Sequence, residues 1–198
     1  MKIFSGIPLF KIKTVFGMAP YLNTPNYSLL FLRRDFMLDE SIKSEIIETT
    51  NLTQKSLLLI NALFKDINDR GGCPYVGHLI RVGDKFVDEN KRIVGYLHDV
   101  VEDTDVDGDE LVRLGFLKEI VDSVLVVTKK DGEMYSDFID RIIESKDVVA
   151  IEVKRSDLED NMDMKRLKTH NQDDYDRLEK YKIAYEKINK FLENIKGE

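Results

Sequence analysis

Apolar residues recur at helical spacing through almost the whole chain after residue 38. Leu57, Ile60 and Phe64 lie on one helical face, and Gly71-Gly72 is predicted to end that helix. Nowhere do two apolar runs flank an Asn-Gly or Asp-Gly turn as the strands of a hairpin would. The pattern therefore predicts an all-α fold.

The remaining helices follow in close succession. Pro74 suits a first helical turn, and the apolar face of the helix that it begins consists of Val76, Leu79, Ile80, Val82 and Phe86. The next helix carries Ile93, Leu97, Val100 and Val101 and continues into an acidic loop that ends near Asp109. Further helices are expected at about 110–128, 135–145, 147–166 and 173–195. Residues 124–127 are apolar enough for a strand, but helix dominates.

The first part of the chain differs from the rest. No acidic residue occurs before Asp35, and the stretch contains Pro8, Pro20 and Pro25 but no helical or alternating period. We therefore divide the chain into an irregular N-terminal extension, residues 1–38, and a helical domain, residues 39–198.

Charge and cysteine content exclude several classes of protein. The 30 Lys and Arg residues against 37 Asp and Glu residues give a net charge of −7, which disfavours nucleic acid as a partner. An anionic substrate would then need a local device, such as a metal ion. The single cysteine, Cys73, cannot form an internal disulfide and suits a reducing compartment such as the cytoplasm. No apolar run is long enough to span a membrane.

Four side chains form a candidate metal site. Adjacent residues on a helix point about 100° apart, so His98 and Asp99 can bind one ion from a single turn. His78 and Asp157 lie on other predicted helices and would complete the site. Imidazole and carboxylate together suit a first-row divalent ion with open positions. Each residue alone would be an ordinary buried histidine or solvated acid, but together they predict a metal site.

Two further carboxylates follow one helical turn later. Glu102 lies four residues after His98, and Asp103 lies four residues after Asp99, so both extend the same helical faces. A carboxylate beside a metal ion can move protons to and from a reacting water. Residues 99–110 contain seven acids and no base, which favours a nearby cation.

The same acidic segment matches the first half of a calcium-binding EF-hand loop. That loop requires a bidentate Glu at its twelfth position, where this chain has Leu114. We therefore interpret the segment as a loop between helices.

A later helix presents three polar residues on one face. Lys154, Asp157 and Asn161 recur at i, i+3 and i+7. Lys154 could meet phosphate charge and Asn161 could donate hydrogen bonds to a substrate. Taken alone, Lys154 and Asp157 would be an ordinary ion pair on a helix surface.

Together these motifs resemble the HD-domain phosphohydrolases, and most closely the alarmone hydrolases of RelA/SpoT-type proteins and their free-standing small relatives. The similar stretches are PYVGHLIRV (74–82), YLHDVVEDTDV (96–106), residues 115–141 and VKRSDLEDNMDMKRL (153–167). The resemblance implies an all-helical HD-domain bundle over roughly residues 55–190. It also implies a divalent ion, usually Mn²⁺, held by His78, His98, Asp99 and Asp157.

The resemblance also implies roles around that ion. Glu102 and Asp103 would handle the attacking water, and Asn161 would contact the substrate. The implied reaction is hydrolysis of guanosine 3′,5′-bis(diphosphate), abbreviated ppGpp, with release of pyrophosphate from the 3′ position. The chain differs from the family in the loop before residue 74, where Arg70 is the sole basic residue and an Arg-Lys pair is usual.

Two alternatives remain beside that reading. The same metal site could serve a phosphohydrolase of other nucleotides, or the chain could be a non-catalytic module that senses nucleotides. A catalytically inactive relative would be expected to lack Glu102, Asp103 or a ligand, and all of them are present.

Overall fold

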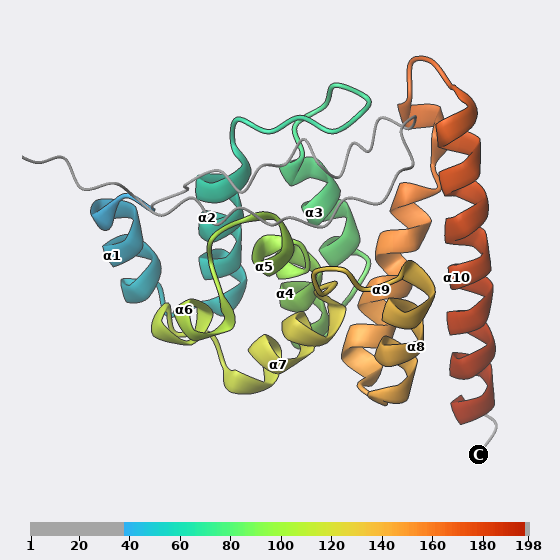
Figure 1. Cartoon of the computed structure of the whole chain (residues 1–198). Coiled ribbons are helices and arrows are strands. Elements are labelled where there is room, and N and C mark those ends of the chain that lie inside the picture. Colours follow the sequence, from blue (N-terminus) through green and yellow to red (C-terminus); the bar gives the residue numbers. More distant parts are fainter. Residues whose placement is uncertain (1–37, 197–198) are drawn as a thin grey trace, which may run out of the picture. The chain divides into compact units, whose positions relative to one another are not determined.

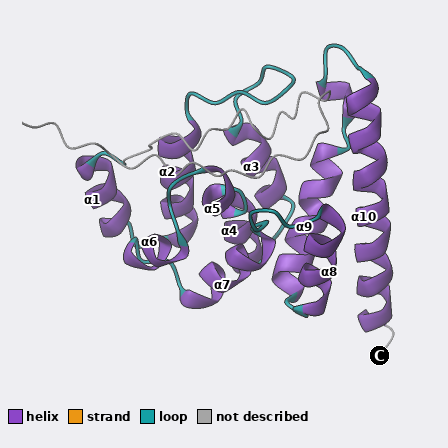
Figure 2. Cartoon of the chain, in the orientation of Figure 1, coloured by secondary structure: helices purple, strands orange, loops and turns teal. Residues whose placement is uncertain are grey.

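A computed structural model describes residues 38–196, and these residues fold as an all-α bundle (Figures 1 and 2). The helices are α1 (Glu40–Glu48), α2 (Leu52–Phe64), α3 (Val76–Asp84), α4 (Glu89–Leu97), α5 (Val100–Asp103), α6 (Gly108–Arg113), α7 (Lys118–Val127), α8 (Tyr135–Glu144), α9 (Val148–Asn161) and α10 (Gln172–Lys196). A 3₁₀ turn, η2 (Met164–Arg166), follows α9. Within the described range there is no strand, so the predicted fold class is confirmed. The expected N-terminal extension lies almost entirely outside the described residues.

Acidic and amide side chains cap the starts of several helices. Asp39 caps α1, where its Oδ1 accepts a hydrogen bond from Ser41 N at 2.8 Å. Asn51, Asp88 and Asp147 cap α2, α4 and α9 in the same way. Asp107, part of the EF-hand-like segment, caps α6 through a 2.7 Å bond from Glu110 N. The acids of this segment thus include a helix cap.

Four expected helices have different bounds in the structure. The first ends at Phe64 rather than at Gly71, and the chain then makes a turn with one antiparallel bridge between Asn68 and Pro74. A Cβ at Gly71 would lie 2.4 Å from the carbonyl oxygen of Arg166, so this turn approaches the end of η2 closely. The expected helix at 147–166 ends at Asn161, before η2.

The other two differences are breaks within expected helices. The helix that should carry residues 93–101 breaks at His98 and Asp99, which separate α4 from α5. The expected helix at 110–128 is two helices, because Gly115 adopts a positive φ of 88° between α6 and α7. Residues 124–127 are helical, as the dominant pattern indicated.

Helices α3 and α4 cross at two glycines. A Cβ on Gly95 would lie 2.6 Å from Gly83 Cα, and a Cβ on Gly83 would lie 2.4 Å from a ring carbon of Tyr96. Only glycine permits this approach of the two backbones. The crossing brings together the helix that carries His78 and the helix that ends just before His98.

Helix α9 lies between two hydrophobic clusters. Val153 belongs to the cluster formed mainly by α2, α3, α4 and α7, whereas Ile151 and Leu158 belong to the cluster with α8 and α10. The helix packs against α3, α4, α7, α8 and α10. Asp157 therefore lies on a helix that packs against five other helices. No helix in the described range is long and apolar enough to cross a membrane.

Candidate metal centre

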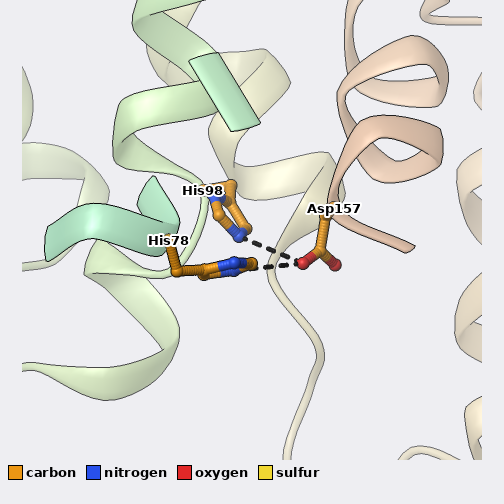
Figure 3. Close-up of side chains that lie close together, drawn as sticks. All are labelled: His78, His98 and Asp157. Carbon is orange, nitrogen blue, oxygen red and sulfur yellow. Dashed lines mark ion pairs between the residues drawn. The ribbon is translucent and has the colours of Figure 1, made fainter. Parts of the chain in front are cut away.

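Three of the four predicted ligands meet in the interior. His78 lies on α3, His98 directly follows α4, and Asp157 lies on α9; all three are buried. Asp157 Oδ1 lies 3.3 Å from His78 Nε2 and 3.5 Å from His98 Nε2 (Figure 3). One ligand atom of each residue lies within 4.8 Å of the others, close enough to hold a single cation.

The fourth predicted ligand, Asp99, faces the same point. Its Oδ2 lies 3.1 Å from His98 Nε2 and 3.8 Å from His78 Nε2. Tyr75 donates a 2.5 Å hydrogen bond from its hydroxyl to this oxygen. The break between α4 and α5 thus allows His98 and Asp99 to converge, although they do not lie within one regular helix.

Outer partners fix the orientation of both imidazoles. His78 Nδ1 donates to Asp160 Oδ2 at 2.6 Å, and His98 Nδ1 donates to the Gly95 carbonyl at 2.8 Å. Because Nδ1 carries a proton in each ring, loss of the other proton leaves the lone pair on Nε2, the nitrogen that faces the carboxylates. This arrangement is typical of histidines that bind a metal ion.

The environment of His98 Nε2 indicates whether a cation fits this site. His98 Nε2 is buried and has no hydrogen-bond partner among the described residues. Burial lowers the pKa of His98, but the charges of Asp99 and Asp157 outweigh it and raise that pKa well above its usual value. The site therefore favours positive charge at this nitrogen, and a divalent cation fits the two nitrogens and two carboxylates.

Asp160 is held by two arginines besides His78. Arg81 Nε donates to its Oδ1 at 2.7 Å, and Arg166 Nη2 lies 3.1 Å from its Oδ2. Burial alone would raise the pKa of Asp160, but its bonds to His78 and Arg81 lower it to well below the usual value. Asp160 thus remains ionised and keeps the His78 ring in position. Sequence reasoning missed it, although it lies three residues after Asp157.

The two candidate catalytic carboxylates both lie on α5. Glu102 Oε2 accepts a 3.0 Å hydrogen bond from the backbone N–H of Lys129, in the loop after α7. Desolvation, followed by the charge of Asp99, raises the pKa of Glu102. Burial and the charges of Asp99 and Glu102 raise the pKa of Asp103 to about 8. Both acids thus lie in the negative field of Asp99, and their catalytic roles remain a prediction.

The three candidate substrate-binding residues occupy different positions. Lys154 Nζ lies 2.7 Å from Asp157 Oδ2, and Asn161 Nδ2 donates to Asp157 Oδ1 at 2.6 Å, so both adjoin the cluster. Arg70 Nη1 lies 2.8 Å from Asp174 Oδ1 at the start of α10. The structure thus joins Lys154 and Asn161 directly to a metal-ligand candidate, and it pairs Arg70 with α10.

Replacing Asp160 with asparagine is expected to weaken metal binding by roughly 10- to 100-fold, the usual cost of losing an outer partner of a ligating histidine. The amide keeps the shape of the side chain but removes the charge that supports His78. Titration of the metal-free protein with Mn²⁺ measures the effect. Arg81→Gln is the control, because it removes a half-exposed partner of Asp160 without touching His78. Equal affinities for both variants and the parent would contradict the assigned role of Asp160.

Comparison with known proteins supports the fold. No protein-family model matches the chain. A solved structure, described as a metazoan ortholog of SpoT that hydrolyzes ppGpp and plays a role in starvation responses, is similar with a TM-score of 0.59 and 22% identity. The match covers 73% of this chain and 86% of that one. The chain therefore has the all-helical fold that its resemblance to the RelA/SpoT-type hydrolases implied.

Proposed function

We propose that this chain is a metal-dependent phosphohydrolase, with ppGpp as its substrate and Mn²⁺ as its cofactor. The observation that carries the proposal is the convergence of His78, His98, Asp99 and Asp157 with both Nε2 atoms directed at the carboxylates. Such a donor set, near acids that can move protons, is typical of hydrolytic sites. The fold shared with a ppGpp hydrolase supports the choice of substrate.

Each residue has a distinct task in this proposal. A divalent cation bound by the four ligands supplies Lewis-acid stabilisation and lowers the pKa of water. Glu102 and Asp103 accept the proton of the attacking water and return one to the leaving group. Lys154 and Asn161, which adjoin Asp157, bind and orient phosphate oxygens, and Arg70 contributes positive charge.

The bonds change as follows. Water oxygen forms a bond to the phosphorus attached to the 3′ oxygen, and the bond from that phosphorus to the 3′ oxygen breaks. The 3′ oxygen takes a proton and becomes the free hydroxyl of GDP, and the other product is pyrophosphate. The substrate is a free nucleotide rather than nucleic acid, consistent with the net charge of −7. The exposed single thiol of Cys73 suits the cytoplasm.

The test compares substrates side by side. The metal-free protein, refilled with Mn²⁺, is offered ppGpp, its adenosine counterpart, GTP and GMP, and the products are separated by ion-exchange chromatography. Release of pyrophosphate from the 3′ position, lost again on chelation, is the expected result. Cleavage of 5′ phosphates alone would indicate a hydrolase of other nucleotides, and no turnover of any compound would indicate a nucleotide-sensing module.

A further inference from the structure

A second group of polar side chains lies beside the metal centre, on α8, α9 and α10. Its members are Tyr135, the first residue of α8, Lys154 of α9, and Lys180 of α10. Asp157 joins the two groups, because its Oδ1 faces the histidines and its Oδ2 lies 2.7 Å from Lys154 Nζ. The two groups therefore meet at Asp157.

Lys180 is exposed and carries a positive charge that no carboxylate of residues 38–196 pairs with. Its Nζ lies 4.5 Å from the ring centroid of Tyr135 and 5.2 Å from that of Tyr181, and no acid lies within ion-pair distance of it in the described part of the chain. Desolvation lowers the pKa of Lys180, and so do the like charges of Lys154 and Lys129. Lys154 Nζ lies 5.0 Å from the ring centroid of Phe138, which packs against Tyr135, so Lys154 and Lys180 contact the same group of aromatic rings.

Tyr135 brings an unused hydrogen-bond donor to the same region. Its hydroxyl oxygen is buried and has no partner among residues 38–196. The ring packs against Tyr181, with centroids 6.0 Å apart, and against Phe138 at 6.1 Å. An unpaired buried hydroxyl costs free energy unless a ligand or water satisfies it.

Lys129 connects this region to the candidate catalytic acid. Its backbone N–H binds Glu102, and its side-chain charge acts on Lys180. Arg141 fixes this loop by donating to the carbonyl oxygens of Val126 and Thr128 at 3.0 and 2.9 Å. The region therefore adjoins Asp157 through Lys154, and the charge of Lys129 relates it to the loop that binds Glu102.

We propose that Lys180 and Tyr135 form a second anion subsite, which binds the non-reacting phosphate group of a substrate that carries two separate phosphate groups. This inference rests on the proposed function, because it assumes that the other phosphate group reacts at the metal centre. An ammonium group and a phenolic hydroxyl both donate to phosphate oxygens. The bound phosphate would balance the charge of Lys180 and satisfy the Tyr135 hydroxyl.

Lys180→Gln is expected to raise the KM for ppGpp roughly 10- to 100-fold with kcat little changed, the usual effect of losing a hydrogen bond to a charged group. Tyr135→Phe should raise the same KM by about tenfold. For guanosine 3′-diphosphate, which lacks a 5′ phosphate, neither variant should change the KM. The matched control is Lys182→Gln, an exposed lysine on the same helix that lies 3.9 Å from Glu179.

Direct binding separates this inference from the proposed function. Calorimetric titration of the full chain with inorganic pyrophosphate, in excess chelator, reports on the subsite without turnover. Affinity that falls in K180Q and Y135F but not in K182Q supports the subsite, even if the parent hydrolyses no nucleotide and the proposed function fails. Identical pyrophosphate affinity and KM in all three variants would overturn the subsite, even where ppGpp is hydrolysed.

Discussion

Asp99→Ala is expected to abolish metal binding and turnover together. Asp99 Oδ2 faces the Nε2 atoms of both His98 and His78, so its removal deletes a charged ligand at the centre of the cluster. The loss of affinity should exceed the roughly 10- to 100-fold cost of losing an outer partner of a ligand. Metal content, measured by mass spectrometry after dialysis against Mn²⁺, and ppGpp turnover test the prediction.

The control for this variant is Asp122→Ala on α7. Asp122 is exposed and lies 2.6 Å from Lys118, so the change removes the same charge far from any buried contact. Melting temperatures of both variants show whether Asp99→Ala still folds. A folded Asp99→Ala protein with the parent's metal content would exclude Asp99 from the ligand set.

Glu102→Gln should lower kcat by roughly 10²- to 10⁴-fold, the usual contribution of a general acid or base. Glutamine keeps an oxygen that can accept the hydrogen bond from Lys129 N, so the loop after α7 should stay in place. The substitution keeps the shape of the side chain and removes its basicity and its negative charge. Metal content should therefore match that of the parent, in contrast to Asp99→Ala.

The matched control for Glu102→Gln is Glu119→Gln, on the exposed first turn of α7. Both substitutions remove one negative charge, so a general effect of charge on a highly anionic substrate would appear in both variants. Equal turnover of Glu102→Gln and the parent at saturating Mn²⁺ would remove Glu102 from the mechanism.

The existence of most helices could be predicted because each buries an apolar stripe at a period of 3.6 residues. Their bounds depend on contacts that the period does not contain. The turn after Phe64 forms because Asn68 bridges to Pro74 and because Gly71 approaches the carbonyl of Arg166, nearly a hundred residues later. The break at His98 and Asp99 likewise interrupts an apolar face that continues on both sides of it.

The convergence of His78, His98, Asp99 and Asp157 could be predicted because the chain has only three histidines, and two of them occur in motifs that resemble those of the HD-domain hydrolases. The residues that hold these side chains in position could not be predicted. Tyr75 contacts Asp99, and Arg81 and Arg166 contact Asp160, only because the fold brings them together. The contact between Lys180 and the Tyr135 ring could not be predicted either, since it joins α10 to α8 across 45 residues of chain.

The enclosed position of α9 has a consequence for how such a sequence can vary. From Val149 to Asp160 no residue is exposed, but one face of α9 carries the partly exposed Glu152, Arg155 and Glu159. Of these, Glu152 pairs with Lys91 and Glu159 pairs with Lys85. The other faces contribute to two hydrophobic clusters or to the candidate ligand set, so a substitution there disturbs packing, the ligand set or both. Change within α9 is therefore expected mainly along the face of Glu152, Arg155 and Glu159, and a change in the ligand that the site accepts would have to arise on neighbouring elements.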